Sequence, residues 1–220
     1  MKPLGKTKRE WSPEVAYAVG LIAADGNLSK DRRHLAFTSG DKDLIKTFCR
    51  CLEISPKIIK KKSGYTGRFD HFQIQFSDVL FYRWLEEVGF MPNKSKILGE
   101  IKVPRELFFD FFRGCYDGDG SMYAYWDPRW HSSYMYYLAI ASASENFLEW
   151  LEHNINELVG IKGKFSRAKG RGATQLRYAK AGTRVLFNKM YYSKDVPCLR
   201  RKLVKAEKIF RIDETHNCAK

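Results

Sequence analysis

Residues 20–26 read Gly-Leu-Ile-Ala-Ala-Asp-Gly, and residues 114–120 repeat the pattern as Gly-Cys-Tyr-Asp-Gly-Asp-Gly. Each copy follows an apolar stretch with helical spacing, and each places an aspartate, Asp25 or Asp119, directly before a glycine. A motif that occurs twice with similar surroundings indicates an internal repeat. The motif pair therefore predicts a chain built from two related halves.

The segments that follow the two motifs support an α+β fold of two pseudo-symmetric αββαββα repeats, residues 1–103 and 104–220. Between Asp25 and the first strand we expect a polar turn, and after Asp119 a tyrosine-rich stretch. Alternation and helical spacing then predict strands at 34–39, 57–62, 71–77, 137–142, 162–166 and 174–178, and helices at 41–52, 78–90, 183–192 and 197–210, with another helix along Phe147 to Leu158.

Composition restricts the class of protein. Hydrophobic residues make up 44% of the chain, which is typical of a folded globular protein. No apolar run approaches the roughly 18 residues that span a bilayer, and the five cysteines form no Cys-x-x-Cys pair, so we expect an intracellular protein with reduced thiols. The formal charge of +14 is divided evenly between the two halves, which favours a polyanionic partner over a basic tail on a neutral body.

The two motif helices are predicted to pack side by side. We expect them to begin at Ser12-Pro13-Glu14 and at Pro104-Arg105-Glu106, because proline and an acid are favoured in a first helical turn. Small residues four apart allow two helix backbones to approach closely. Such residues are Gly20 and Ala24 in the first helix, and Gly114 and Gly118 in the second.

This packing would bring Asp25 and Asp119 together, with Gly26 and Gly120 as C′ residues that end both helices. Two carboxylates there would repel each other and the negative helix ends, so the pair indicates a divalent cation. The backbone carbonyls of Ala24 and Gly118 are further candidate ligands. The alternative is that each Asp-Gly pair only forms a turn.

The strand at 71–77 alternates strictly, with apolar residues on one face and His71, Gln73 and Gln75 on the other. Amide, imidazole and guanidinium groups can bind base edges in a major groove, which admits a β-ribbon. The alternative is ordinary solvent exposure. We predict that the DNA-binding residues are Lys30, Arg32, Arg33, Lys60, Lys61, Lys62, Arg68, His71, Gln73, Gln75, Lys164, Arg167, Lys169, Arg171, Gln175 and Arg177.

The motifs resemble those of the LAGLIDADG homing endonucleases. Residues 18–26 match six of the nine family letters, and residues 112–120 match four, including both acids and both glycines. The resemblance covers nearly the whole chain and is to the monomeric, single-chain type with two motifs. The sixth letter is Ala23 in the first copy and Asp117 in the second, and this position is not the family's catalytic acid.

The resemblance implies a saddle of two four-stranded antiparallel sheets over double-stranded DNA, with the motif helices at the interface. It also implies that Asp25 and Asp119 bind Mg²⁺, for which Mn²⁺ can substitute, and that both DNA strands are cut across the minor groove. A basic residue near each metal site would be Lys94 in the first half and Lys202 in the second. The alternative is that both are surface lysines near a helix start.

The sequence therefore favours a metal-dependent, site-specific DNA endonuclease. A protein that binds without cutting remains the alternative, either an RNA maturase that assists intron splicing or a DNA-binding regulator of the same fold. A glycosidase with two carboxylates is disfavoured by the positive charge.

Overall fold

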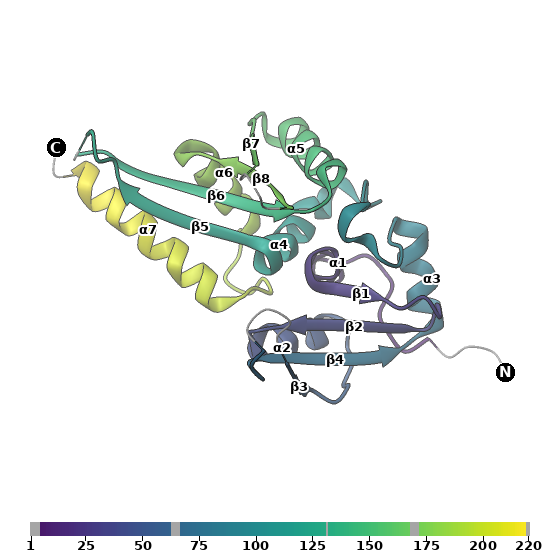
Figure 1. Ribbon diagram of the computed structural model, residues 1–220. Helices are drawn as coiled ribbons and strands as arrows, with labels where there is room; N and C mark the ends of the chain where they lie inside the picture. Colours follow the sequence, from purple (N-terminus) through teal and green to yellow (C-terminus); the bar gives the residue numbers. More distant parts are fainter. Residues whose placement is uncertain (1–4, 63–66, 131, 168–171, 219–220) are drawn as a thin grey trace.

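The computed structural model describes residues 5–62, 67–130, 132–167 and 172–218. In these residues two four-stranded antiparallel sheets flank a central pair of helices, α1 (Pro13–Asp25) and α4 (Phe108–Asp119) (Figure 1). The predicted α+β class, the repeated αββαββα order and the central place of the motif helices are confirmed.

The two halves have the same topology. The first sheet has the strand order β1-β2-β4-β3, and the second has the equivalent order β5-β6-β8-β7. The remaining elements are β1 (Gly26–Leu28), β2 (His34–Ser39), α2 (Lys42–Cys51), β3 (Ile59–Lys61), β4 (His71–Ser77), α3 (Val79–Val88), β5 (Gly120–Trp126), β6 (Tyr134–Ser142), α5 (Glu145–Val159), β7 (Lys164–Arg167), β8 (Thr174–Tyr178), α6 (Lys180–Met190) and α7 (Arg200–Cys218).

Helices cover one face of each sheet and leave the other face open. In the first half, α2 and α3 pack on the face of Leu35, Phe37 and Ile74, all of which are buried. In the second half, α5 and α6 pack on β6 and β8, where Leu138 and Leu176 are buried. Because side chains alternate along a strand, the intervening residues lie on the open faces.

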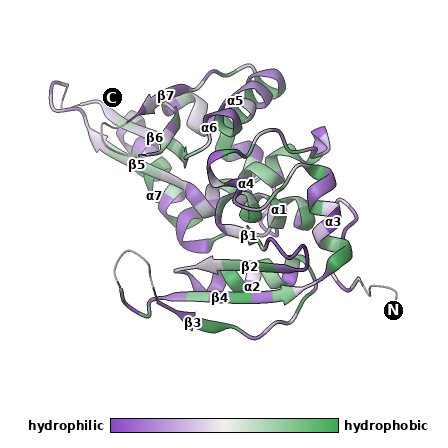
Figure 2. Ribbon diagram, turned by 45° about the vertical axis from the view of Figure 1, so that its right-hand side comes forward, coloured by the Kyte–Doolittle hydropathy of each residue, from purple (hydrophilic) through white to green (hydrophobic). Residues whose placement is uncertain are grey.

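Helix α1 begins as predicted. The Ser12 hydroxyl accepts a hydrogen bond from the Val15 N–H at 3.3 Å, and Pro13 occupies the first helical position. The helix is apolar and buried on all sides from Val15 to Ala23, which suits its place between the two halves (Figure 2). The second motif helix begins later than predicted, because a 3₁₀ turn (Arg105–Leu107) precedes Phe108.

The glycines allow α1 and α4 to pack with their backbones in contact. A Cβ on Gly20 would lie 2.0 Å from the carbonyl oxygen of Phe111, and a Cβ on Gly114 would lie 2.1 Å from that of Tyr17. Real Cβ atoms do not approach other atoms this closely. The interface that was predicted from the small residues therefore depends on the absence of a side chain at both positions.

Two strands were not anticipated as such. The expected polar turn after Asp25 begins with the short strand β1, and the tyrosine-rich stretch after Asp119 forms the longer strand β5. Three residues are too few for a recognisable alternation in β1. The last two helices also differ from the predicted bounds: α6 begins at Lys180, and α7 runs from Arg200 to Cys218.

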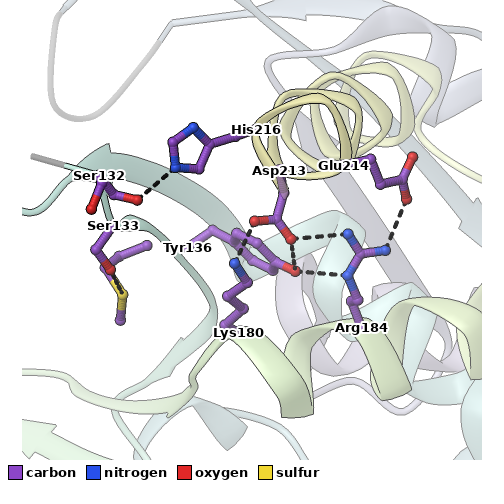
Figure 3. A network of polar contacts seen from close by, with 9 residues as sticks. Ser132, Ser133, Tyr136, Lys180, Arg184, Asp213, Glu214 and His216 are labelled. Carbon is purple, nitrogen blue, oxygen red and sulfur yellow. Dashed lines mark hydrogen bonds and ion pairs between the residues drawn. The ribbon is translucent and has the colours of Figure 1, made fainter. Parts of the chain in front are cut away.

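Helix α7 is fixed to the second half by an apolar contact and a polar network. Phe210 packs edge-on against Tyr136 of β6. Beside it, Asp213 forms ion pairs with Lys180 and Arg184 of α6, and the Arg184 Nε–H donates to the Tyr136 hydroxyl at 2.9 Å (Figure 3). This attachment orients the helix that carries Lys202. No helix among the described residues is both long enough and apolar enough to traverse a bilayer.

Candidate active site and nucleic-acid interface

Asp25 and Asp119 are the last residues of α1 and α4, so the helix packing brings their ends together. A Cβ on Gly118 would lie 2.3 Å from the Cβ of Ala24 and 3.4 Å from Oδ2 of Asp25. The Asp25 carboxylate therefore reaches the backbone of α4 one residue before Asp119. The two motif aspartates occupy one site between the halves.

Both carboxylates are held in a setting that disfavours their charge. Burial and the neighbouring Asp119 carboxylate raise the pKa of Asp25 from 3.8 to about 6. Burial also raises the pKa of Asp119, while the ammonium groups of Lys94 and Lys202 lower it. Perturbed acids of this kind are typical of functional sites.

Lys94 lies at the C-terminal end of the first motif helix. It belongs to a 3₁₀ turn (Lys94–Lys96) and is only 5% exposed. Its Nζ donates to the carbonyl oxygen of Ala23 at 2.6 Å and to that of Ala24 at 3.4 Å. These are carbonyls of the last helical turn, which have no partner within the helix.

Lys202 has the same place in the second half. It lies in the first turn of α7, is 9% exposed, and donates through Nζ to the carbonyl oxygens of Tyr116 and Gly120, both at 2.6 Å, and of Gly118 at 3.3 Å. The alternative that Lys94 and Lys202 are surface lysines is thus wrong. Burial lowers the pKa of Lys94, and it lowers the pKa of Lys202 to about 8.

The donor set fits a hard divalent cation through its two carboxylates. The carbonyls of Ala24 and Gly118 were predicted to be free to bind the metal, but each accepts a hydrogen bond from a buried lysine ammonium. Within the described residues no cluster of three or more His, Cys, Asp or Glu residues could hold a metal. Mg²⁺ commonly binds one or two carboxylates and completes its shell with water and substrate phosphate, which Asp25 and Asp119 would permit.

The motif glycines have a different role from the one expected. Gly26 and Gly120 follow the helices but have φ near −80° and begin strands, so neither is a left-handed C′ residue. A Cβ on Gly26 would lie 2.7 Å from the Cα of Ile22, and a Cβ on Gly120 would lie 2.5 Å from the carbonyl oxygen of Tyr116. Glycine is required because the chain turns sharply back over the last helical turn.

Asp117 contributes a structural link that the sequence analysis did not identify. It is 1% exposed and accepts hydrogen bonds through Oδ2 from the Tyr17 hydroxyl at 2.7 Å and the Leu199 N–H at 2.6 Å. The fully buried Arg113 donates to the carbonyl oxygen of Pro197 at 2.9 Å. Both residues thereby fix the segment that leads to Lys202. The sequence feature that could have indicated this role is a charged residue within an apolar helix.

The open face of the first sheet presents four of the predicted DNA-binding residues, three of them on β4. His71, Gln73 and Gln75 alternate along β4 and point away from the covering helices. Lys61 pairs with His71 and lies on this face, whereas Lys60 pairs with Phe72 and lies on the opposite face. Because β3 also alternates, Lys60 does not share the open face with Lys61, and its place in the sheet does not support its predicted role in DNA binding.

The second sheet gives an equivalent arrangement. Gln175 and Arg177 lie on the open face of β8, and Lys164 of β7 pairs with Arg177. Arg167 instead pairs with the buried Thr174, and its guanidinium bonds to Glu145 of α5 at 2.8 Å. Arg167 is thus turned toward the helices, and its place in the sheet does not support its predicted role in DNA binding.

The other predicted basic residues lie in connecting segments. Lys30, Arg32 and Arg33 are exposed in the β1–β2 turn, where Arg32 bonds to Glu86 at 3.1 Å. Lys62 and Arg68 are exposed next to β3 and β4, and Lys169 and Arg171 lie outside the described residues.

Several solved structures have this fold. The I-LtrWI LAGLIDADG homing endonuclease bound to target DNA is similar over 94% of this chain and 91% of its own, with 13% identity and a TM-score of 0.62. I-DmoI in complex with DNA and Mn covers 83% of this chain and 97% of its own, with 19% identity and a TM-score of 0.51.

The N-terminal LAGLIDADG domain of DUF199/WhiA is also similar, over 90% of this chain and 88% of its own, with 19% identity and a TM-score of 0.56. No protein-family model and no curated protein matches the sequence. At these identities the comparisons establish the LAGLIDADG fold, which the motif resemblance predicted. They show the fold alone and not the activity.

Proposed function

We propose that this chain, which has the LAGLIDADG fold, is a site-specific double-strand DNA endonuclease that acts as a monomer with a divalent metal ion. The observation that carries the proposal is the paired carboxylates of Asp25 and Asp119, each raised in pKa and each beside a buried lysine. The net charge of +14 and the polar open sheet faces suit a long duplex. Related structures contain target DNA or DNA with Mn.

In the proposed reaction the acids, the lysines and the sheets have different roles. Asp25 and Asp119 would hold Mg²⁺ or Mn²⁺, which supplies an activated water and stabilises charge on the phosphate. Lys94 and Lys202, fixed at the two helix ends, would hold or release a proton near the phosphates, because burial lowers the pKa of both ammonium groups. The sheets of the two halves, proposed as domains 1–103 and 104–220, would bind the flanking base pairs.

The test is cleavage of a plasmid that carries the gene's own insertion site, with Mg²⁺ or with a chelator. Wild type should cut both strands at one position only when metal is present. Asp25→Asn and Asp119→Asn should lose double-strand cutting but retain binding in a gel-shift assay. Asp43→Asn, an exposed position, is the matched control.

A DNA-binding regulator that does not cut is the second candidate, since the same fold also occurs in the N-terminal LAGLIDADG domain of DUF199/WhiA. Binding of the duplex by wild type without metal-dependent cutting would favour this function. Cutting by the Asp25→Asn, Asp119→Asn double variant would refute the assignment of the acids.

A further inference from the structure

The two open sheet faces differ in chemistry. On the first sheet, the face is formed by hydrogen-bonding side chains that include Thr38, Gln73 and Gln75. On the second sheet, the corresponding hairpin is longer, because β5 has seven residues and β1 has three. The extra length carries tyrosines that have no counterpart in the first half.

Tyr123, Tyr125 and Tyr137 form what we call the tyrosine strip. Tyr123 pairs directly with Tyr137 across β5 and β6, and their ring centroids lie 5.4 Å apart with an interplanar angle of 19°. The Tyr125 ring lies 6.2 Å from that of Tyr137 at an angle of 11°. Met135, opposite Tyr125, extends the apolar surface on the same face.

The strip borders positive charge on the same sheet face. Arg177 pairs with Ala139, which lies two residues from Tyr137 along β6 and on the same face, and Lys164 pairs in turn with Arg177. The Nε–H of Arg177 is buried and has no hydrogen-bond partner among the described residues. Cations beside an apolar strip suit a polyanion that also carries apolar groups. A nucleic acid is such a partner, because its phosphates are charged and its bases have apolar parts.

The ring geometry favours a duplex over a single strand. Unpaired bases stack on exposed aromatic faces. In the tyrosine strip the rings of Tyr123 and Tyr125 each lie nearly parallel to the ring of Tyr137, with centroids 5.4 and 6.2 Å away, so the facing sides of these rings are not available to an unpaired base. Ring edges and methionine side chains can contact a groove, where the C5-methyl group of thymine is the apolar feature of the major groove.

We propose that the tyrosine strip is a specificity-determining surface that contacts thymine methyl groups, so that the base pairs under β5 and β6 are selected by apolar contacts beyond the reach of Gln175 and Arg177 on β8. The half-site under the first sheet is selected by hydrogen bonds from Gln73 and Gln75. This inference rests on the proposed binding of duplex DNA but not on cleavage. It assigns the two halves of one target to two different kinds of readout.

The experiment is a selection of bound sequences from two randomised duplex libraries, carried out with the full chain in a chelator. One library contains thymidine, and the other contains deoxyuridine throughout, which pairs identically and lacks only the methyl group. With thymidine, both halves of the site should be enriched, and one half should contain preferred T·A pairs. With deoxyuridine, this half should lose its preference for those T·A pairs, while the other half keeps its sequence preference.

Affinity for the selected duplex should then fall about fourfold for each contacted thymine that is replaced by uracil, as expected for one buried methyl group. Tyr137→Ser should abolish this discrimination, Tyr137→Phe should retain it, and Gln75→Ala should leave it unchanged while relaxing the other half. Equal enrichment of both halves in both libraries would overturn the inference alone. Absence of enrichment in both libraries would overturn sequence-specific duplex binding as well.

Two further outcomes would reassign the strip. Loss of discrimination in Tyr137→Phe would mean that the hydroxyl groups make the contact, which contradicts an apolar readout. Tighter binding of a single-stranded oligonucleotide than of any duplex, abolished by Tyr137→Ser, would assign the strip to unpaired bases.

Discussion

Lys60 and Lys61 are neighbours in sequence but lie on opposite faces of the first sheet, because β3 alternates. Lys61 pairs with His71 on the open face, and Lys60 pairs with Phe72 on the face of the helices. Both side chains are exposed and carry the same charge. The pair therefore separates the effect of position from the effect of net charge.

Lys61→Ala should weaken binding to all duplex sequences and reduce the slope of log K against log salt by about one unit, since one phosphate contact is lost. Lys60→Ala removes an equal charge from the other face and should leave the slope nearly unchanged. Affinity measured over a series of salt concentrations tests both variants. Equal slopes of log K against log salt for the two variants would show that the open face of the first sheet does not determine which lysine contacts phosphate.

Gly20→Ala should destabilise the protein by several kcal/mol, because the new Cβ would enter the backbone of α4 at Phe111. Gly182→Ala is the matched control, since its Cβ would make an ordinary contact at 3.4 Å and alanine is favoured in a helix. Thermal and denaturant unfolding compare the two. A Gly20→Ala protein with unchanged stability would contradict the close helix contact.

Asp25→Asn should stabilise the protein at pH 8 in a chelator by roughly 1–3 kcal/mol. The pKa of Asp25 rises from 3.8 to about 6 on folding, so its contribution is favourable at low pH and is lost as the pH rises through 6. The gain from asparagine should therefore shrink toward pH 4. Urea unfolding at both pH values measures it, with Asp43→Asn as the control, and a destabilised variant at pH 8 would contradict the buried charge pair.

Lys202→Met should slow cleavage of one DNA strand by roughly a hundredfold or more, the usual range for a lost proton-transfer group. Nicked duplex should accumulate, because Lys94 remains in place at the other helix. Lys205→Met, on the exposed side of the same helix, should cut normally. A duplex labelled separately on each strand reports both rates, and equal slowing of the two strands would argue for a general structural effect.

Much of the architecture could be predicted from periodicity. The bounds of β2, β4 and β8 agree with the predicted strands because each alternates clearly between apolar and polar residues. β1 could not be predicted, since it is short and is formed by pairing with Leu35 to Phe37, a contact that involves a later part of the chain. The start of α4 differed because Pro104 precedes a 3₁₀ turn rather than the α-helix.

The candidate site was only partly predictable. The positions of Asp25 and Asp119 followed from the repeated motif, but the burial of Lys94 and Lys202 depends on how two distant segments fold back over the helix ends. The family resemblance indicated both lysines, but nothing in the composition around them predicts their burial. The hydrogen bond from the Leu199 N–H to Asp117 likewise joins residues that are far apart in the chain.

The two unlike open faces have a consequence for the evolution of recognition. An assembly of two identical subunits presents the same side chains to both halves of its site, and such assemblies are matched to palindromes. In this chain, equivalent positions carry different residues, for example Thr38 in β2 and Ala141 in β6. A substitution at Thr38 changes one half of the surface and leaves the other intact, so each side can drift to a new sequence independently and no palindrome is required.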